Sequence, residues 1–408
     1  MRLFCALDLK RPPRVLSPSR SAEGSRTAAG AAEEGGRPEV KVTYHVFKDF
    51  RMEVSSSSDE EVLSLLRGRN RAAARTRMYS YVSMCYHPTR KKLFLGCTHR
   101  AGDIMVEFDP RTRKFKSCGF ARSGLFNPHI TKIHKGITLD EKGEALYFGT
   151  ASLSPLSQTI DSKGGLLVRY DIRKRKFTKI ANPAPGDYFQ GTCFDLERGR
   201  AYAFTDRAAF VVYDMRKKKT LRYESMESCP HSGVIDDRGG VWGTYGAGRH
   251  AFYRYNPKNN RFEFPKNCAF HNATAAAGIM YPGAGPVDSI VNGRDGYLYS
   301  GSALGELYRI DPRSGEVKYL GKPFPGIRLP GMTLADDGWI YMCGAKDFGT
   351  LLARYSPTED RFERFGQVKA DDGEFLYYGH ELAVIDGTVF IGETDNKNRT
   401  GYLWACQI

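Results

Sequence analysis

The feature that most constrains the fold of this chain is a repeated hairpin. Six segments each combine a hydrophobic strand, a turn that begins with Asp, Asn or Ser, a basic tip and a second short strand. They read VEFDPRTRKFKS, VRYDIRKRKFTK, VVYDMRKKKTLR, YRYNPKNNRFEF, YRIDPRSGEVKY and ARYSPTEDRFER. The copies lie roughly 40 to 60 residues apart, which is the spacing of β-propeller blades. Such units bury their faces only by stacking on one another, so the repeat predicts a radial, closed fold.

Each of these segments follows another hairpin, in which two apolar strands flank an Asp/Gly turn. GITLDEKGEALYFG and GMTLADDGWIYMCG are two examples. Asp and Gly tolerate the positive φ angles that tight β-turns require. Together the two hairpins predict one four-stranded antiparallel blade.

The ends of the chain predict how the ring closes. SYVSMCYHPTRKKLFLG supplies a seventh unit, and the last unit, from Gly379, stops at GYLWACQI without a fourth strand. VKVTYHVFKDF, near residues 40–50, is the expected substitute. We therefore predict an all-β, seven-bladed propeller over residues 40–408, closed by an N-terminal strand. Residues 1–39 are expected to be disordered or to reflect a wrongly assigned start, and DEEVLSLLRGRNRAAARTR to form a helix or a flexible strap.

Composition limits the class of partner. Among 408 residues, 61 Lys and Arg outnumber 46 Asp and Glu, for a net charge of +15. The positive electrostatic potential that this charge creates favours anionic partners. By itself it does not distinguish among nucleic acids, anionic glycans, anionic lipid surfaces and small acidic substrates. No apolar run approaches the roughly 20 residues that span a bilayer. We expect a monomer that acts on an anionic carbohydrate, with no membrane or nucleic-acid partner.

The nine cysteines show no C-x-x-C or Cys/His finger spacing. They lie mostly in apolar strand patterns, which indicates free, buried thiols and a reducing compartment. Asp8 and Lys10 interrupt the only short apolar stretch at the N-terminus, so no signal peptide is visible. This favours a cytoplasmic location, and secretion stays open if the start is wrongly assigned.

Histidines gather at one predicted rim of the propeller. The innermost strand of each blade lines the channel, and the loops that lead into it share a rim with those between the second and third strands; we call this rim the top. His134 and Lys135 lie where the inner strand of blade 2 begins. The corresponding positions in other blades are Ser83, Gln190, His231, Asp288, Pro330 and His380. Seven of the nine histidines fall in top segments: His99, His129, His134, His231, His250, His271 and His380.

Each histidine alone is more often a loop-bracing residue than a ligand or base, so the clustering carries the functional prediction. Other chemistries lack support. The Gly-rich GAGP and GTYGAG precede no helix that could bind phosphate, and no G-x-S-x-G elbow occurs. The basic tips RKRK and RKKK are typical of solvated turns.

The repeats, the polar inner-strand residues and the basic rim resemble the seven-bladed propeller enzymes typified by streptogramin lyase and by propeller-type polysaccharide lyases that cleave uronate-containing glycans. The resemblance lies in architecture. WD dipeptides, kelch glycine pairs, Asp-boxes and lactonase motifs do not occur. The resemblance implies His, Tyr and Arg side chains from the top rim, sometimes around a divalent metal ion. The residues of these types in this sequence are His134, Tyr188, His231, Tyr245, Arg249 and His380.

The predicted reaction is β-elimination on a uronate-containing glycan at the channel mouth. It needs a cation beside the carboxylate, a base for the α-proton and an acid for the leaving oxygen. His134 or His231 is the candidate base, and Tyr188 or Tyr245 the candidate acid. The remaining candidates, for neutralising the carboxylate or contacting substrate, are Arg249, Lys135, Arg207, His99 and Arg399. A divalent ion (Mn, Ca, Mg or Zn), if bound, is expected on His134, His231, His380 and Gln190.

Two alternatives stay open. One is a non-catalytic propeller that binds an acidic partner, and the other is a glycoside hydrolase acting on a similar glycan. Glycoside hydrolases usually place two carboxylates at the bond. The acidic rim residues are scattered over blades 3, 5 and 7, whereas blades 2 and 4, which carry His134 and His231, offer none; they are Asp206, Asp288, Glu381, Glu393 and Asp395. This distribution favours elimination.

Overall fold

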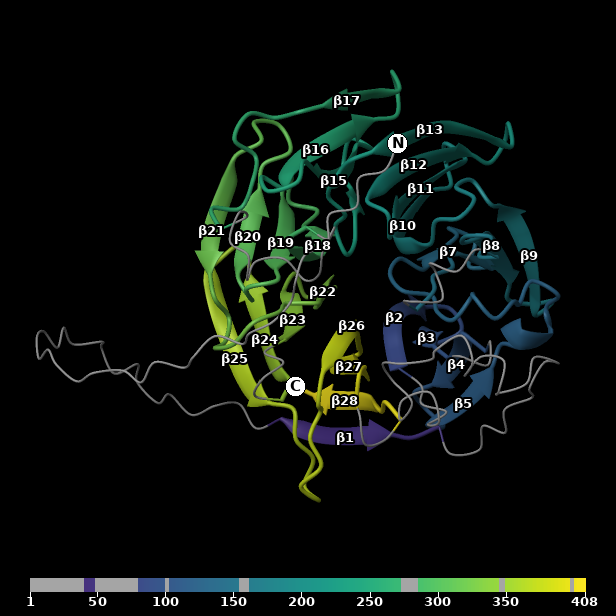
Figure 1. Ribbon diagram of the computed structural model, residues 1–408. Coiled ribbons are helices and arrows are strands. Elements are labelled where there is room, and N and C mark those ends of the chain that lie inside the picture. Colours follow the sequence, from purple (N-terminus) through teal and green to yellow (C-terminus); the bar gives the residue numbers. More distant parts are fainter. Residues whose placement is uncertain are drawn as a thin grey trace, which may run out of the picture. The chain divides into compact units, whose positions relative to one another are not determined.

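Seven four-stranded antiparallel sheets surround a common axis, as the computed structural model of the chain shows (Figure 1). The structure describes residues 40–47, 80–99, 103–153, 161–272, 285–344, 349–396 and 400–408. The predicted all-β, seven-bladed propeller is therefore confirmed. The predictions for residues 1–39 and for DEEVLSLLRGRNRAAARTR lie outside the described residues.

The first four blades follow the predicted hairpins, and their strands run in chain order from the inner strand outward. Blade 1 contains β2 (Ser80–His87), β3 (Lys92–Thr98), β4 (Met105–Asp109) and β5 (Lys114–Ser117). Blade 2 contains β6 (Thr138–Leu139), β7 (Ala145–Gly149), β8 (Leu167–Asp171) and β9 (Lys176–Ala181). Blade 3 contains β10 (Phe189–Asp195), β11 (Arg200–Thr205), β12 (Ala209–Asp214) and β13 (Lys219–Ser225). Blade 4 contains β14 (Val234–Ile235), β15 (Val241–Tyr245), β16 (Ala251–Asn256) and β17 (Arg261–Glu263).

The last three blades complete the ring. Blade 5 contains β18 (Val287–Asn292), β19 (Leu298–Ser302), β20 (Leu307–Ile310) and β21 (Val317–Gly321). Blade 6 contains β22 (Gly331–Leu334), β23 (Ile340–Gly344), β24 (Leu351–Ser356) and β25 (Arg361–Gln367). Blade 7 contains β26 (Gly379–Ile385), β27 (Thr388–Glu393), β28 (Leu403–Gln407) and, from the other end of the chain, β1 (Lys41–His45). Within the described residues, a 3-10 helix, Phe120–Arg122, follows blade 1.

The ring closes as predicted, through the N-terminal strand. β1 pairs antiparallel with β28, from Lys41 opposite Gln407 to His45 opposite Leu403. Tyr44 stacks on Tyr402, with ring centroids 4.8 Å apart, and its hydroxyl donates to Asp372. Blade 7 thus combines strands from both ends of the described chain, and β1 is its outermost strand.

The repeated polar residue of the outer hairpins has a local role. Asp109 follows β4, and its carboxylate accepts the backbone N–H groups of Arg111 and Thr112. Asp214 makes the same bonds with Arg216 and Lys217. A side chain that binds the backbone two or three residues ahead replaces a turn hydrogen bond, which explains why Asp, Asn and Ser recur there.

The hydrophobic core lies between neighbouring blades. Phe94 of blade 1 packs in one cluster with Phe148 and Val168 of blade 2, and similar clusters join the following pairs of blades. The inner strands are held rigidly by this packing, so the residues at their upper ends have fixed positions. Among the described residues, no helix is long and apolar enough to span a bilayer.

Candidate functional site

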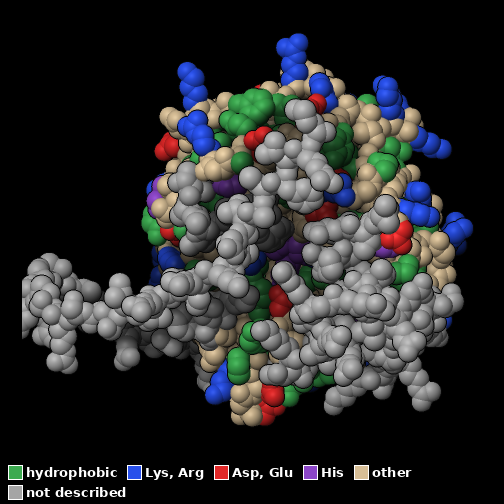
Figure 2. Space-filling model, viewed as in Figure 1, with side chains coloured by type: hydrophobic (Ala, Val, Ile, Leu, Met, Phe, Trp, Pro, Cys, Tyr) green, Lys and Arg blue, Asp and Glu red, His purple; other side chains and the backbone are tan. Residues whose placement is uncertain are grey.

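Three histidines from three different blades meet near the axis of the propeller. One ring nitrogen from each of His134, His231 and His380 lies within 4.8 Å of the others, and all three side chains are buried. Their ring centroids are 4.4 to 5.2 Å apart. We call these three residues the tri-histidine centre. In the face that Figure 2 shows, histidine side chains are visible toward the middle, and Lys and Arg side chains lie around the periphery.

Bulges in the inner strands place His380 in the tri-histidine centre and Asp288 beside it. The pairing of the inner with the second strand skips one residue in four blades, and the skipped residues are Val82, Gln190, Asp288 and His380. A bulge inserts one extra residue and redirects its side chain, and such bulges are common beside functional sites. His380 enters the centre in this way. His134 and His231 instead lie in the segments that precede β6 and β14.

Hydrogen bonds fix the orientation of two of the rings. The Nδ1 atom of His231 lies 3.1 Å from the Asp288 carboxylate, and that of His380 lies 3.0 Å from the carbonyl oxygen of Val82. Because a carboxylate and a carbonyl only accept, both Nδ1 atoms must donate, and each Nε2 keeps its lone pair. A carboxylate or carbonyl on the far nitrogen is typical of metal-binding histidines.

His134 completes the centre differently. Its Nε2 lies 2.9 Å from the Nε2 of His231, and its buried Nδ1 has no hydrogen-bond partner. A buried ring nitrogen without a partner is rare in native proteins. Because one nitrogen of each of the three rings lies within 4.8 Å of the others, the donor set fits a divalent metal ion. Among the predicted ions, all-imidazole coordination favours Zn over Ca or Mg, which prefer oxygen.

The three imidazoles are neutral near pH 7. Burial, and next the Lys132 ammonium, hold the pKa of His134 well below its usual range. Burial lowers the pKa of His231 to about 4, against the opposing effect of Asp288. Burial, followed by the nearby Lys135, likewise depresses the pKa of His380. Neutral imidazoles can accept a proton or bind a metal ion, so either chemistry is available at this centre.

Asp288 and Arg328 form a support that the sequence prediction did not include as functional residues. The Arg328 guanidinium binds both oxygens of Asp288, at 2.7 Å each, and the backbone N–H of Leu329 adds a third bond at 3.0 Å. Burial alone would raise the pKa of Asp288, but Arg328 and His231 hold it well below the usual range. The available sequence signal was the position of Asp288 at the start of an inner strand.

Lys135, a predicted substrate contact, reaches across the channel from blade 2. Its ammonium donates to the carbonyl oxygens of Pro330 and His380, at 2.8 and 2.9 Å, and to the Glu381 carboxylate at 2.9 Å. A lysine has three N–H donors, so this arrangement uses all of them within the protein. Lys135 therefore ties blade 2 to blades 6 and 7 beside His380, and it has no donor left for a substrate.

Lys132 lies nearby and was not among the predicted site residues. Burial lowers the pKa of its ammonium to about 8, partly offset by the carboxylates of Asp395 and Asp206. In the sequence it was one more cation in FNPHITKIHKG, with nothing to separate it from Lys135.

The predicted tyrosines pack away from the histidines. Tyr188 is 1% exposed, lies in the core between blades 1 and 2, and accepts a hydrogen bond from Ser162 at 3.0 Å. The ring of Tyr245 packs edge-on against Phe264, with centroids 4.8 Å apart. Within the described residues, neither tyrosine makes a hydrogen bond or ring contact with the tri-histidine centre. Their proposed role as the acid gains no geometric support.

The other predicted residues occupy varied positions. Arg207 is 60% exposed in its side chain and lies 3.5 Å from Asp187, and Arg249 is exposed. His99 is buried, and its Nδ1 accepts the backbone N–H of Asp103 at 3.3 Å. Gln190 occupies the β10 bulge, the position that His380 has in β26. Arg399 lies outside the described residues.

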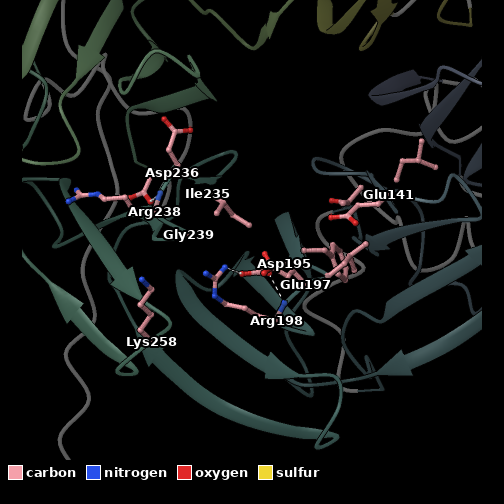
Figure 3. Close-up of a pocket in the computed structure, with 14 residues that line it drawn as sticks. Glu141, Asp195, Glu197, Arg198, Ile235, Asp236, Arg238, Gly239 and Lys258 are labelled. Atoms are coloured by element: carbon pink, nitrogen blue, oxygen red, sulfur yellow. Dashed lines mark hydrogen bonds and ion pairs between the residues drawn. The ribbon is translucent and has the colours of Figure 1, made fainter.

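A separate hollow of about 630 Å³ lies among the hairpin tips of blades 2, 3 and 4, at the opposite ends of their inner strands (Figure 3). Its charged side chains are largely paired with each other or the backbone. Asp195 binds Arg198 at 2.8 Å, and Arg238 donates to the carbonyl of Pro312 at 2.6 Å. Glu141, Glu197 and Lys258 also line the hollow, but no histidine does, so the tri-histidine centre is the better candidate for acid–base or metal chemistry.

Comparison with known proteins supports the fold and leaves the chemistry open. No family model matches the chain, and no curated protein matches it. A streptogramin B lyase structure matches with 13% identity and a TM-score of 0.59, covering 81% of this chain and 93% of that one. An inactive histidine-to-alanine variant of virginiamycin B lyase from Staphylococcus aureus, in complex with quinupristin, matches with 11% identity and a TM-score of 0.60, covering 91% and 100%. The RRP9 WD40 repeats match with 11% identity and a TM-score of 0.55, covering 84% and 96%.

Proposed function

We propose that this protein is a lyase that cleaves a uronate-containing glycan by β-elimination at the tri-histidine centre. The observation that carries the proposal is the convergence of three buried, neutral imidazoles at the channel mouth, one of them held by an Asp–Arg pair. The solved structures with this architecture include two lyases, and one is described as inactive after a histidine is replaced.

His231 is the best-placed base in the chain itself. Asp288 holds its Nδ1–H, so the Nε2 lone pair is oriented toward the centre, and its pKa of about 4 keeps the ring neutral before reaction. His134 Nε2 lies 2.9 Å from this lone pair, so a substrate would have to take its place. In the elimination, the base takes the proton from C5 of the uronate, and the electrons of that bond form the C4–C5 double bond. The bond from C4 to the leaving oxygen breaks, and the oxygen keeps the bonding electrons and takes a proton from water. Asp288 would stabilise the imidazolium that forms, as a carboxylate does beside a catalytic histidine.

The same residues would hold a divalent metal ion. His134, His231 and His380 are the expected ligands, with Gln190 as the predicted fourth, and a bound ion would neutralise the uronate carboxylate as a Lewis acid. A metal ligand cannot also serve as the base, so these are alternative uses of His231. Metal content of the purified protein, followed by activity after chelation, separates them.

Hydrolysis of a similar glycan has less support. The two carboxylates nearest the histidines are engaged inside the protein, Asp288 by Arg328 and Glu381 by Lys135. Asp288 is fully buried. Inverting and retaining hydrolases need two carboxyl groups free to meet the glycosidic bond. Elimination requires no such pair.

A binding propeller is the second candidate, because the WD40 repeats resemble this chain nearly as well as the lyases do. Incubation with a panel of uronate-containing polysaccharides separates the candidates. Elimination creates a conjugated double bond, so we expect new ultraviolet absorbance together with new reducing ends, and a loss of at least about a hundredfold for His231→Ala. Reducing ends without absorbance would indicate hydrolysis, and binding without either product would indicate the binding propeller.

A further inference from the structure

The backbone around Lys132 is held firmly between two blades. Lys132 forms β-bridges with Thr98 at the end of β3 and with Ala151 just after β7. Its backbone N–H donates to the carbonyl of Ala151 at 3.2 Å, and its own carbonyl accepts the N–H of Ala151 at 2.7 Å. The side chain therefore starts from a fixed point rather than from a free loop.

The extended backbone sets the direction of the side chain. Successive residues of an extended segment point to opposite sides, so Lys132 and His134 share a side and Ile133 faces the other. Ile133 is fully buried in the core between blades 1 and 2. Lys132 consequently faces away from that core, toward the tri-histidine centre, and its charge is felt by both His134 and His380.

Lys132 has no partner in the described part of the protein. Its ammonium makes no hydrogen bond or ion pair there, and Asp206 and Asp395 act on it only from beyond ion-pair distance. The other cations around the centre are engaged: Lys135 by three acceptors and Arg328 by Asp288. The Lys132 side chain is only partly buried, so water can solvate its ammonium, and the carboxylate of an anionic ligand could take the place of that water.

We propose that Lys132 binds the carboxylate of a uronate ligand above the tri-histidine centre. This inference rests on the proposed function, because it names the chain's own group that holds the acidic sugar at the site. It replaces Lys135 in that role. The ammonium would donate a charge-assisted hydrogen bond to the carboxylate, which fixes the sugar ring with its C5 side toward the histidines.

Binding of single sugars tests the inference without requiring turnover. The probes are D-galacturonate, D-glucuronate and the uncharged methyl ester of D-galacturonate, titrated by ligand-observed NMR. We expect the wild-type protein to bind the two acids more tightly than the ester. Lys132→Met should lose about tenfold to a hundredfold in affinity for the acids and little for the ester, because it removes one charged hydrogen bond. Lys132→Arg should retain part of the affinity.

The matched control is Lys142→Met, which removes the same charge from an exposed turn at the opposite end of blade 2. It should bind all three probes as the wild type does, which excludes an effect of net charge. Circular dichroism checks folding, and Lys132→Gln takes the place of Lys132→Met if that variant is unfolded.

Three results would overturn the inference: equal acid affinity for Lys132→Met and wild type, no preference of the wild type for acid over ester, or no binding of any probe. The proposed function fails separately. Acid binding that depends on Lys132, with no elimination product from any polysaccharide, would support carboxylate binding by Lys132 and refute the lyase reaction. If Lys132→Met catalyses elimination with the wild-type kcat/KM, the lyase reaction would be supported and carboxylate binding by Lys132 refuted.

Discussion

At the scale of single residues, the candidate site depends on one carboxylate. Asp288 connects Arg328 to His231, with 2.7 Å bonds on one side and a 3.1 Å bond on the other. The carboxylate is fully buried, so its charge is tolerated only because both partners are present. It therefore sets which nitrogen of His231 faces the centre.

Asp288→Asn should weaken metal binding at the centre. The amide keeps the shape but loses the charge that orients His231, and such supporting changes typically reduce metal affinity about tenfold to a hundredfold. Calorimetric titration with Zn measures the change. The control is Asp295→Asn, in the β18–β19 turn of the same blade. The Asp295 carboxylate accepts a hydrogen bond from the Tyr299 hydroxyl, away from the centre, so this substitution should leave the Zn affinity unchanged. An unchanged Zn affinity for Asp288→Asn would exclude the supporting role.

Lys135→Met should destabilise the fold. The substitution leaves the partly buried Glu381 carboxylate and two carbonyl oxygens without their donor. Removing one member of a fully buried ion pair costs about 3–5 kcal/mol, and the partial exposure of Glu381 should make the loss smaller. Urea unfolding measures the loss. The double variant Lys135→Met/Glu381→Gln should recover much of it, since the charge is gone. Equal free energies of unfolding for the wild type and Lys135→Met would show that the Lys135 ammonium does not stabilise the fold.

At the scale of elements, the inner strands combine two functions. Their alternating apolar residues pack between blades, while single bulges at their upper ends turn His380, Asp288 and Gln190 out of that pattern. The closing strand β1 carries a titratable residue, His45, at its contact with blade 1. His45 lies against the ring of Phe108 of blade 1, with centroids 5.1 Å apart.

Acid should weaken the attachment of β1. Burial, and then Arg113, lower the pKa of His45 from 6.5 to about 4. The folded state therefore binds the proton less readily than the unfolded state, so the contribution of neutral His45 is complete above pH 6.5 and is lost as the pH falls toward 4. Urea unfolding of wild type and His45→Gln across this range measures it. Parallel losses in both proteins would show that His45 is not responsible.

At the scale of the whole molecule, stability depends on closure of the ring. β1 supplies five paired residues to β28, and without it the outer edge of blade 7 is open. Every blade packs on two neighbours, so an opened ring weakens more than one interface.

Deleting residues 1–47 should lower the melting temperature markedly, whereas deleting residues 1–35 should leave it unchanged. The first deletion removes β1, and the second leaves it intact. Thermal unfolding followed by circular dichroism compares the two proteins with the full chain. Equal melting of both truncated proteins would contradict closure by β1.

The sequence alone determined the architecture. Asp109, Asp214 and their equivalents occupy turns that bind their own backbone, and this local chemistry, together with strand alternation, specifies hairpins without reference to the rest of the chain. The missing fourth strand of the last unit then required a partner from elsewhere, and VKVTYHVFKDF was a suitable strand. Since each blade carries the same pattern, the inner-strand positions also predicted that His134, His231 and His380 would share one rim.

The tertiary structure decided which of these side chains meet and which are already engaged. A bulge shifts one residue, and its place cannot be read from alternation, so the orientation of Asp288 and His380 was not predictable. Lys132 and Lys135 are equivalent cations in the sequence. Only the approach of blades 6 and 7 gives Lys135 three acceptors and leaves Lys132 without one. The acceptors lie 195 to 246 residues further along the chain, and contacts at such separations leave no trace in local patterns.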